Sequence, residues 1–197
     1  MRFLFVFLLG LFPACVLWAQ PAGYSAPKDL NDFKLRFSAA SQKVGSIESD
    51  FTQVKNLSML KDKVTSRGKF YYKKANKVRI EYTKPFTYLM VLNNNDMKVK
   101  DEQKSTNFNT RSNKMMQSIN TIMLDCMRGT VYSNKDFQTA VFESGKDYLL
   151  LLTPTAPVMK KLFARIEVFL DKSRFDELRI NMVENGGDNS LMSFTNR

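Results

Sequence analysis

The sequence predicts an α+β fold, in which an antiparallel barrel or a strongly curved antiparallel sheet is covered by helices. Roughly nine segments have the alternation or the β-branched and aromatic content of strands, and short turns separate them. Two further segments have the three- and four-residue spacing of amphipathic helices. We expect these helices to close the concave side of the sheet. A sheet of this kind encloses an apolar interior, and a large interior can hold a ligand.

The first nineteen residues are predicted to be a signal peptide. Arg2 is followed by an apolar run over residues 3–16, which is too short to span a bilayer, and Ala19 is a small residue at the expected cleavage point. The mature protein is therefore expected in the periplasm. Two alternatives remain open: an uncleaved membrane anchor, and a lipoprotein acylated at Cys15.

The rest of the chain is predicted to be one domain. Residues 20–28 are rich in proline, glycine and serine and are expected to form a flexible leader. Residues 29–197 are long enough to bury a core as a single unit. If Cys15 leaves with the signal peptide, Cys126 has no partner for an intrachain disulfide, and we interpret it as a core thiol.

The first helix is predicted over residues 29–44. Asp29 is a suitable N-cap, and Gly45 ends the helix. Its apolar residues recur every three or four positions and are Leu30, Phe33, Phe37, Ala40 and Val44.

The strands are most regular between residues 68 and 92. In the segment 77–82, Val78, Ile80 and Tyr82 face one side, as in a half-buried antiparallel strand. Residues 73–76 are a plausible tight turn, and Asn93-Asn94-Asn95-Asp96 is a strong hairpin signal. The predicted strands are 47–57, 64–72, 77–82, 88–92, 97–100, 137–143, 148–153, 164–170, 177–183 and 191–195. The polar segment 101–114 is predicted to be a mobile loop.

The second helix is predicted over residues 115–127 and is rich in methionine. Met115, Ile119, Ile122 and Cys126 lie on one stripe, with Met116 and Met123 beside it. Methionine side chains adapt to ligands of varied shape, so a methionine-rich helix over an aromatic sheet would suit flexible acyl chains. The alternative is that methionine fills an irregular core, and periodicity cannot separate a filled core from a ligand cavity.

The composition excludes several classes of enzyme. The chain has no histidine, which removes Ser-His-Asp and Cys-His catalysis and the zinc sites that use imidazole. It also has no P-loop, dinucleotide-binding glycine motif or Gly-x-Ser-x-Gly elbow. Glu48 and Asp50 alternate along a strand and are interpreted as a solvated face. A Ser–Lys hydrolase stays open on composition alone, but we expect no enzyme, no cofactor and no metal.

The chain is basic. Its formal net charge is +11, and removal of the first nineteen residues leaves +10, because Arg2 is the only charge there. The basic residues are scattered and form no recognition-helix cluster, so we do not expect nucleic acid as a partner. An anionic membrane surface or an acidic protein partner fits the charge equally well.

A set of short motifs resembles the LolA family, the periplasmic carriers of outer-membrane lipoproteins. They are Phe51-x-Gln53, Gly68-x-Phe70 and Asn76-Lys77-Val78-Arg79-x-Glu81-Tyr82-x-x-Pro85-Phe86, and the weaker resemblance runs from about Asp29 to the C-terminus. It implies an incomplete, unclosed antiparallel β-barrel, with helices forming a lid over an apolar cavity that takes lipoprotein acyl chains. It also implies an inner-membrane release complex and an outer-membrane acceptor as partners of a monomeric carrier.

The resemblance also directs the choice of site residues. The acyl-chain cavity is predicted to be lined by Phe51, Phe70, Tyr72, Val78, Ile80, Tyr88, Met90, Ile119, Ile122 and Met123. The family commonly has Arg-Pro-Asn after the second strand, where the Arg helps control lid closure; this chain has Lys74-Ala75-Asn76. Lys74 is therefore the candidate lid latch, although lysine lacks the planar donor set of arginine.

Three functions stay open on this basis. The first is a soluble lipoprotein carrier. The second is the same fold binding a different lipid or acting as a lipid-sensing regulatory module. The third is a membrane-anchored lipoprotein acceptor, which depends on acylation of Cys15.

Overall fold

The computed structural model describes residues 21–59, 62–74 and 76–197, so the predicted signal peptide over residues 1–19 lies outside the described residues. Its helices are α1 (Leu30–Lys43), α2 (Lys114–Arg128) and α3 (Pro157–Lys160), with 3-10 turns η1 (Thr110–Ser112) and η2 (Val131–Ser133). Its strands are β1 (Ser46–Asn56), β2 (Val64–Lys73), β3 (Lys77–Lys84), β4 (Tyr88–Asn93), β5 (Asp96–Lys100), β6 (Ser105–Asn109), β7 (Phe137–Glu143), β8 (Asp147–Pro154), β9 (Phe163–Asp171), β10 (Glu177–Glu184) and β11 (Asn189–Thr195).

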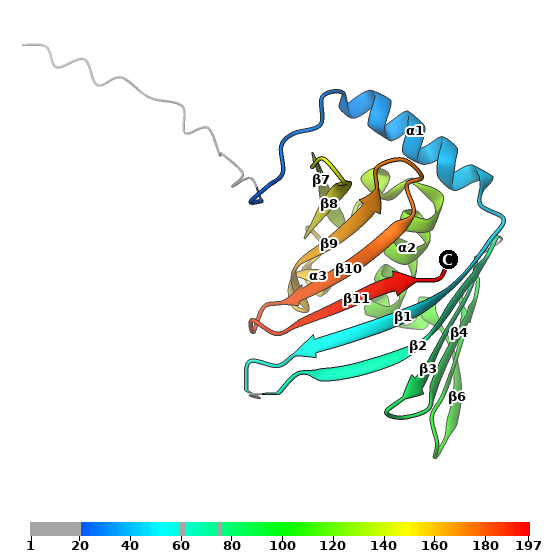
Figure 1. Cartoon of the computed structure of the whole chain (residues 1–197). Helices are drawn as coiled ribbons and strands as arrows, with labels where there is room; N and C mark the ends of the chain where they lie inside the picture. The colour runs from blue at the N-terminus through cyan, green and yellow to red at the C-terminus, as the bar shows by residue number, and fades with distance from the viewer. Residues whose placement is uncertain (1–20, 60–61, 75) are drawn as a thin grey trace, which may run out of the picture.

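The strands form one curved antiparallel sheet. Within the described ranges it has eleven strands in the order β6-β5-β4-β3-β2-β1-β11-β10-β9-β8-β7. Strands β6 and β7 are its two edges and do not pair with each other, so the barrel stays open. Figure 1 shows the sheet curving around α2, which joins the two edge strands along the chain. The predicted unclosed antiparallel barrel with helices is confirmed.

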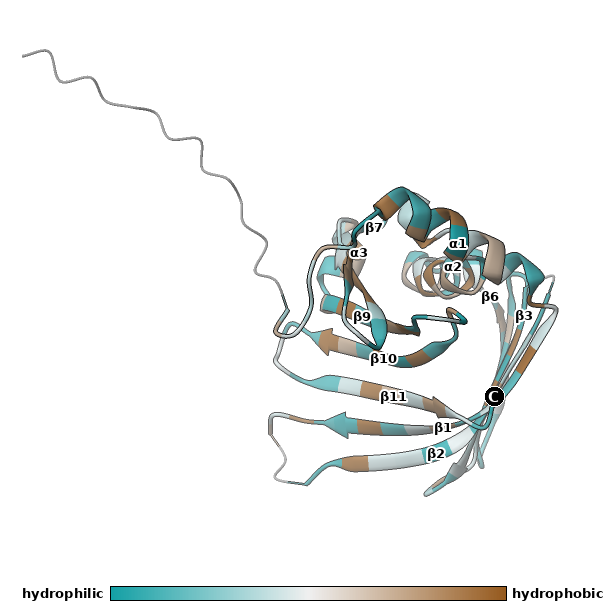
Figure 2. Ribbon diagram, turned by 45° about the horizontal axis from the view of Figure 1, so that its top comes forward, coloured by the Kyte–Doolittle hydropathy of each residue, from teal (hydrophilic) through white to brown (hydrophobic). Residues whose placement is uncertain are grey.

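The pairing of β1 with β11 joins the two halves of the chain. Strands β1 to β6 form one meander and β7 to β11 the other, and Phe51 lies opposite Phe194 where the two meanders meet. Figure 2 shows α1 and α2 together over the concave face of this sheet. The core therefore lies between the helices and one face of the sheet, as expected when a sheet buries only one face.

Side-chain caps set the start of each long helix. The Asp29 carboxylate accepts hydrogen bonds from the backbone N–H groups of Asn31 and Asp32, and α1 buries Phe33 and Phe37. The Asn113 side chain caps α2 in the same way, and Gly129 ends α2 in the left-handed conformation with φ of 67°. Both helices and the ten predicted strands agree with the structure to within two residues at each end.

The prediction of a loop over residues 101–114 is wrong for most of that segment. Residues Ser105–Asn109 form edge strand β6, which pairs with β5, and η1 follows it. This edge strand carries four polar residues, and only Phe108 packs against the core. This strand consequently lacks the apolar alternation by which the other strands are recognised.

The segment before α1 contacts the far edge of the sheet. Tyr24 Oη donates to Asp147 Oδ1 at 2.7 Å, and Ser25 forms an isolated antiparallel bridge with Glu143 on β7. Outside this bridge, residues 21–28 carry no regular helix or strand.

Candidate functional site

An apolar cavity lies between α2 and the concave face of the sheet. Phe70, Ile80 and Met90 occupy one row across β2, β3 and β4, because each lies opposite the next in the strand register. The stripe of α2 faces this row. Together with strands from the other half of the sheet, they enclose a cavity of about 350 Å³.

The lining is almost wholly apolar and unusually rich in methionine. Eight of the eleven methionines of the chain line the cavity. The lining residues are Phe70, Ile80, Met90, Met97, Met116, Ile119, Asn120, Ile122, Met123, Cys126, Met127, Leu152, Met159, Phe163, Ile166, Val168, Ile180, Met182, Met192 and Phe194. Unbranched, polarizable side chains such as methionine can rearrange around a flexible hydrocarbon chain.

The cavity volume distinguishes this interior from an ordinary filled core. Protein cores contain few voids larger than a water molecule, whereas ligand pockets span roughly 300–1,000 Å³. The cavity of about 350 Å³ falls in the second range. The structure therefore favours a binding cavity over a filled core, the choice that periodicity left open.

Six of the ten residues predicted from the sequence line this cavity, and the structure brings them together from β2, β3, β4 and α2. They are Phe70, Ile80, Met90, Ile119, Ile122 and Met123. Their contact with acyl chains stays a prediction.

The other four predicted residues are placed outside the cavity lining. Phe51 packs beside Tyr82, with ring centroids 5.0 Å apart, and Tyr88 lies on the other side of Tyr82 at 5.7 Å. Tyr72 and Val78 are buried and lie opposite each other in the register of β2 and β3. All four share the concave face with the cavity residues, so alternation along a strand cannot separate the two groups.

Sequence reasoning missed the cavity residues from the second half of the sheet. Met159 on α3, Met182 on β10 and Met192 on β11 contribute to the lining. The eleven methionines of the chain suggest a methionine-rich interior, but these three are isolated in the sequence, so no local pattern assigns them to a cavity. Only the pairing of β1 with β11 brings this half of the sheet opposite β2, β3 and β4.

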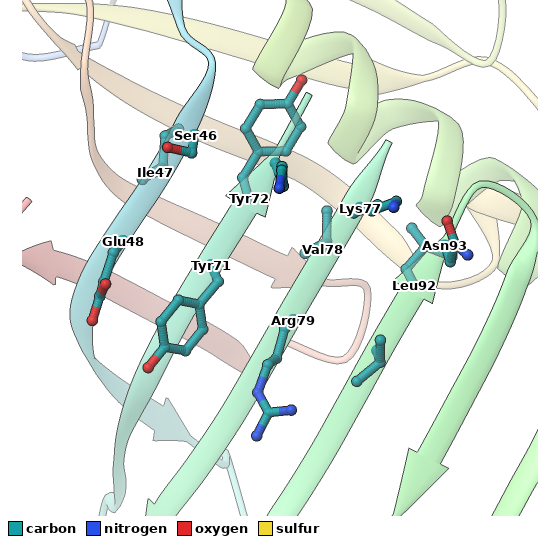
Figure 3. Close-up of a pocket in the computed structure, with 12 residues that line it drawn as sticks. Ser46, Ile47, Glu48, Tyr71, Tyr72, Lys77, Val78, Arg79, Leu92 and Asn93 are labelled. Atoms are coloured by element: carbon teal, nitrogen blue, oxygen red, sulfur yellow. The ribbon is translucent and has the colours of Figure 1, made fainter. Parts of the chain in front are cut away.

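A second hollow of about 470 Å³ lies over β1 to β4, and Figure 3 shows the residues around it. Glu48, Tyr71 and Arg79 lie side by side in its lining, in register across β1, β2 and β3. Glu48 and Arg79 are exposed, and Arg79 donates to Glu81 at 2.9 Å. This larger hollow is open and carries charge, so it does not offer the dry surface that a hydrocarbon chain requires.

Polar side-chain contacts hold α2 over the cavity. Arg128 donates to the side-chain oxygen of Asn76 in the β2–β3 turn. Asn120 Nδ2 donates to the backbone oxygen of Asn94 in the β4–β5 turn at 3.1 Å. Ser118 Oγ donates to Asp136 Oδ2 at 2.5 Å on the opposite side. Helix α2 is therefore tied to both halves of the structure by individual hydrogen bonds.

The candidate latch Lys74 contacts α1 rather than α2. Its Nζ donates to the backbone oxygen of Gln42, in the last turn of α1, at 3.0 Å. A lysine at this point also interacts favourably with the carbonyl end of the helix.

The titratable groups near the cavity are shifted by burial. Burial raises the pKa of the Cys126 thiol, so this side chain is neutral near pH 7 in the closed structure. Burial also raises the pKa of Glu177, although Arg197 Nη1 lies 2.7 Å from its Oε2. In the described residues, no group of three His, Cys, Asp or Glu side chains is arranged to hold a metal ion.

The helices of the described ranges are also all too short or too polar to cross a bilayer.

The sequence of this chain matches the model of a known protein family. The sequence model of the family described as outer membrane lipoprotein carrier protein LolA matches residues 42–197. No curated protein sequence matches the chain.

Several solved structures are similar at low sequence identity. A LolA superfamily protein from Nitrosomonas europaea has 10% identity over 83% of this chain and 91% of its own, with a TM-score of 0.44. The lipoprotein LppX of Mycobacterium tuberculosis has 13% identity over 83% of this chain and 92% of its own, with a TM-score of 0.44. The MucA/MucB complex of Pseudomonas aeruginosa matches at 13% identity, covering 83% of this chain and 54% of that one, with a TM-score of 0.44.

Proposed function

We propose that this protein, which belongs to the LolA family of outer membrane lipoprotein carrier proteins, shields the acyl chains of lipoproteins in the cavity under α2. The single observation that carries the proposal is that cavity, with a volume of about 350 Å³ and a lining dominated by methionine and other apolar side chains. On this proposal the protein is exported to the periplasm and ferries its cargo from the inner to the outer membrane.

The energetics of acyl chains support a shielding role. Exposure of hydrocarbon to water costs about 0.8 kcal/mol per methylene, so a chain of about fifteen methylenes requires roughly 12 kcal/mol of shielding. A lipoprotein cannot cross an aqueous compartment unless such chains are covered. The apolar lining under α2 offers that cover, and its methionines can accommodate chains of different length.

Release of the cargo requires a lid that opens at modest cost. The ties of α2 to Asn76 and Asn94 are single hydrogen bonds, each of which contributes about 0.5–1.5 kcal/mol. On our proposal, Lys74 adds a contact that holds α1 beside the lid. An inner-membrane release complex and an outer-membrane acceptor are the proposed partners of a monomeric carrier, and they would shift the balance between closed and open forms.

Mass spectrometry of the protein purified from periplasm tests the proposal. An organic extract and a tryptic digest are analysed, with the Ile119→Glu variant purified in parallel as a control for adhering lipid. A co-purified triacylated N-terminal peptide that is absent from the variant is the expected result. Free lipid alone would favour the alternative in which the fold carries or senses a different lipid, and a ligand-free protein would contradict acyl binding.

The membrane-anchored acceptor is tested separately. Cys15→Ser is expected to leave the distribution of the protein between membrane and soluble fractions unchanged. A shift from the membrane to the soluble fraction would overturn the soluble-carrier proposal in favour of the acceptor.

A further inference from the structure

The outer face of the first half of the sheet is hollowed on the side opposite the apolar cavity. Tyr71, Arg79 and Val91 lie opposite one another in the register of β2, β3 and β4, and Figure 3 shows Tyr71 beside Arg79. They alternate along their strands with core residues such as Leu92, which is 0% exposed. Side chains at alternate positions of a strand point to opposite faces of the sheet, so this hollow lies outside the barrel.

Two hollows join on this face. The hollow of about 470 Å³ over β1 to β4 shares Val91 and Asn93 with a neighbouring hollow of about 400 Å³ over β4 to β6. Together they form a groove, here called the basic groove, that crosses the strands from Glu48 on β1 to Asn107 on β6. Neighbouring strands lie about 4.8 Å apart, so the groove is about 24 Å long, which an extended segment of about seven residues spans.

Lysines without an ion-pair partner line the basic groove. Lys73, Lys77 and Lys98 are exposed, and none of them forms an ion pair with a carboxylate of the described residues. The two carboxylates in the lining, Glu48 and Asp96, each already have a side-chain partner on a neighbouring strand. The groove is therefore left with positive charge that the fold does not neutralise.

The strands of the second half of the sheet differ in this respect. Within β7 to β11, all of whose residues are described, the cationic residues are Arg165 and Arg179. Each is paired with a carboxylate, since Arg165 Nε lies 2.6 Å from Glu167 Oε1 and Arg179 Nη2 lies 3.3 Å from Asp147 Oδ2. Uncompensated positive charge is thus a property of the basic groove and not of the whole outer surface of the sheet.

We infer that the basic groove binds an acidic polypeptide segment of about seven residues in an extended conformation. Its carboxylates would meet Lys73, Lys77 and Lys98, because complementary charge favours encounter and selects the partner. An apolar side chain at its centre would cover Tyr71 and Val91, which are half-buried in the lining. The groove lies on the face opposite the cavity, so this inference goes beyond the proposed function and does not depend on it.

The shape of the groove favours a polypeptide over an anionic membrane. A bilayer surface is flat on this scale and would meet exposed lysines at the rim, but it would not reach the half-buried Tyr71 and Val91. An extended chain can lie in the groove and contact both.

Labelled heptapeptides test the inference by fluorescence anisotropy with the full chain. The first has leucine at its centre and Glu or Asp elsewhere, the second has serine in place of leucine, and the third keeps leucine but carries Gln and Asn instead of the acids. We expect the first to bind at least about tenfold more tightly than the third, through several charge contacts, and about two- to tenfold more tightly than the second, through partial burial of leucine. Its binding should weaken as salt is added.

Variants locate the binding site. Lys77→Glu/Lys98→Glu should lower the affinity for the first peptide by at least about tenfold, because two attractive charges become repulsive. Lys146→Glu/Lys160→Glu makes the same charge change at exposed positions in the second half of the chain and should lower it less than about threefold. Tyr71→Ala should remove the difference between the leucine and serine peptides. Circular dichroism like that of the parent shows that each variant is folded.

Equal binding of the first and third peptides by the parent would overturn the inference. Equal losses in the two double variants would also overturn it, because the peptide would then respond to the net charge of the whole chain. Binding to phosphatidylglycerol vesicles that Lys77→Glu/Lys98→Glu abolishes, without binding of the first peptide, would assign the groove to a membrane and overturn it as well. A parent that binds the first peptide as expected but no fluorescent fatty acid would support the inference while contradicting the proposed function.

Discussion

The side chain of Arg128, in the last turn of α2, donates a hydrogen bond to the side-chain oxygen of Asn76, in the turn between β2 and β3. Asn76 adopts a left-handed conformation with φ of 65° and donates through Nδ2 to Asn94 Oδ1 at 3.2 Å. One end of the helix over the cavity is thereby connected to two adjacent hairpin turns.

Loss of this contact should let α2 open more often. In Arg128→Ala, Cys126 is expected to react with a thiol-disulfide exchange reagent about two- to tenfold faster, because opening exposes a thiol that is now 6% exposed. The reaction is measured in a Cys15→Ser background, so that Cys126 is the single thiol.

Arg165→Ala is the matched control, because Arg165 is also an exposed arginine with a side-chain partner, Glu167, but it lies on β9. Its thiol reactivity should equal that of the parent. Equal reactivity in Arg128→Ala and the parent would show that Arg128 does not hold the helix closed.

A charge on the cavity side of α2 should prevent acyl binding. Ile119→Glu places a carboxylate in the apolar lining, and burial of an unpaired charge under a bound chain costs several kcal/mol. We expect the affinity for a fluorescent fatty acid to fall by at least about 100-fold, while the circular dichroism of the strands is retained.

Gln117→Glu adds the same charge to an exposed position of the same helix and should bind normally. Unchanged binding by Ile119→Glu would mean that acyl chains do not lie under α2.

Gly68 allows β2 and β3 to approach closely. A Cβ atom at this position would lie 2.0 Å from the backbone oxygen of Glu81 and 2.7 Å from Cζ of the Phe51 ring. Gly68→Ala must therefore shift backbone, and we expect it to lower the free energy of unfolding in urea by about 3 kcal/mol.

Gly145→Ala serves as the control, since nothing lies within 4 Å of its added Cβ, and its effect should stay within about 0.5 kcal/mol. Similar stabilities for the two variants would contradict the steric account.

The buried Glu177 should make stability depend on pH. Its pKa is raised in the folded protein by burial, which outweighs the attraction of Arg197. Between the unfolded pKa, about 4.3, and the higher folded pKa, the folded state binds more protons than the unfolded state. The contribution of Glu177 to stability is therefore complete below the unfolded pKa and falls as pH rises through this window.

Urea unfolding at several pH values between about 4 and 7 tests this dependence. The stability of Glu177→Gln relative to the parent should rise with pH across the window. A constant difference between Glu177→Gln and the parent would mean that Glu177 titrates alike in both states.

Local patterns were sufficient to predict much of this architecture. Alternation in the segment 77–82, the Asp29 cap and the spacing of the apolar residues in α2 depend on neighbouring residues alone, and these elements agree with the structure. Six of the predicted cavity residues were also found, because the period of a strand or helix determines which face is apolar.

The sequence by itself therefore determined the class of the fold and the apolar faces of its elements, since both follow from short-range periodicity. Only the tertiary structure decided which apolar residues surround empty space. Phe51 and Phe70 lie on the same face of adjacent strands, but Phe51 is packed against Gly68 and Tyr82, whereas Phe70 borders the cavity. That difference depends on the pairing of β1 with β11 and on the position of α2, which bring distant residues into contact.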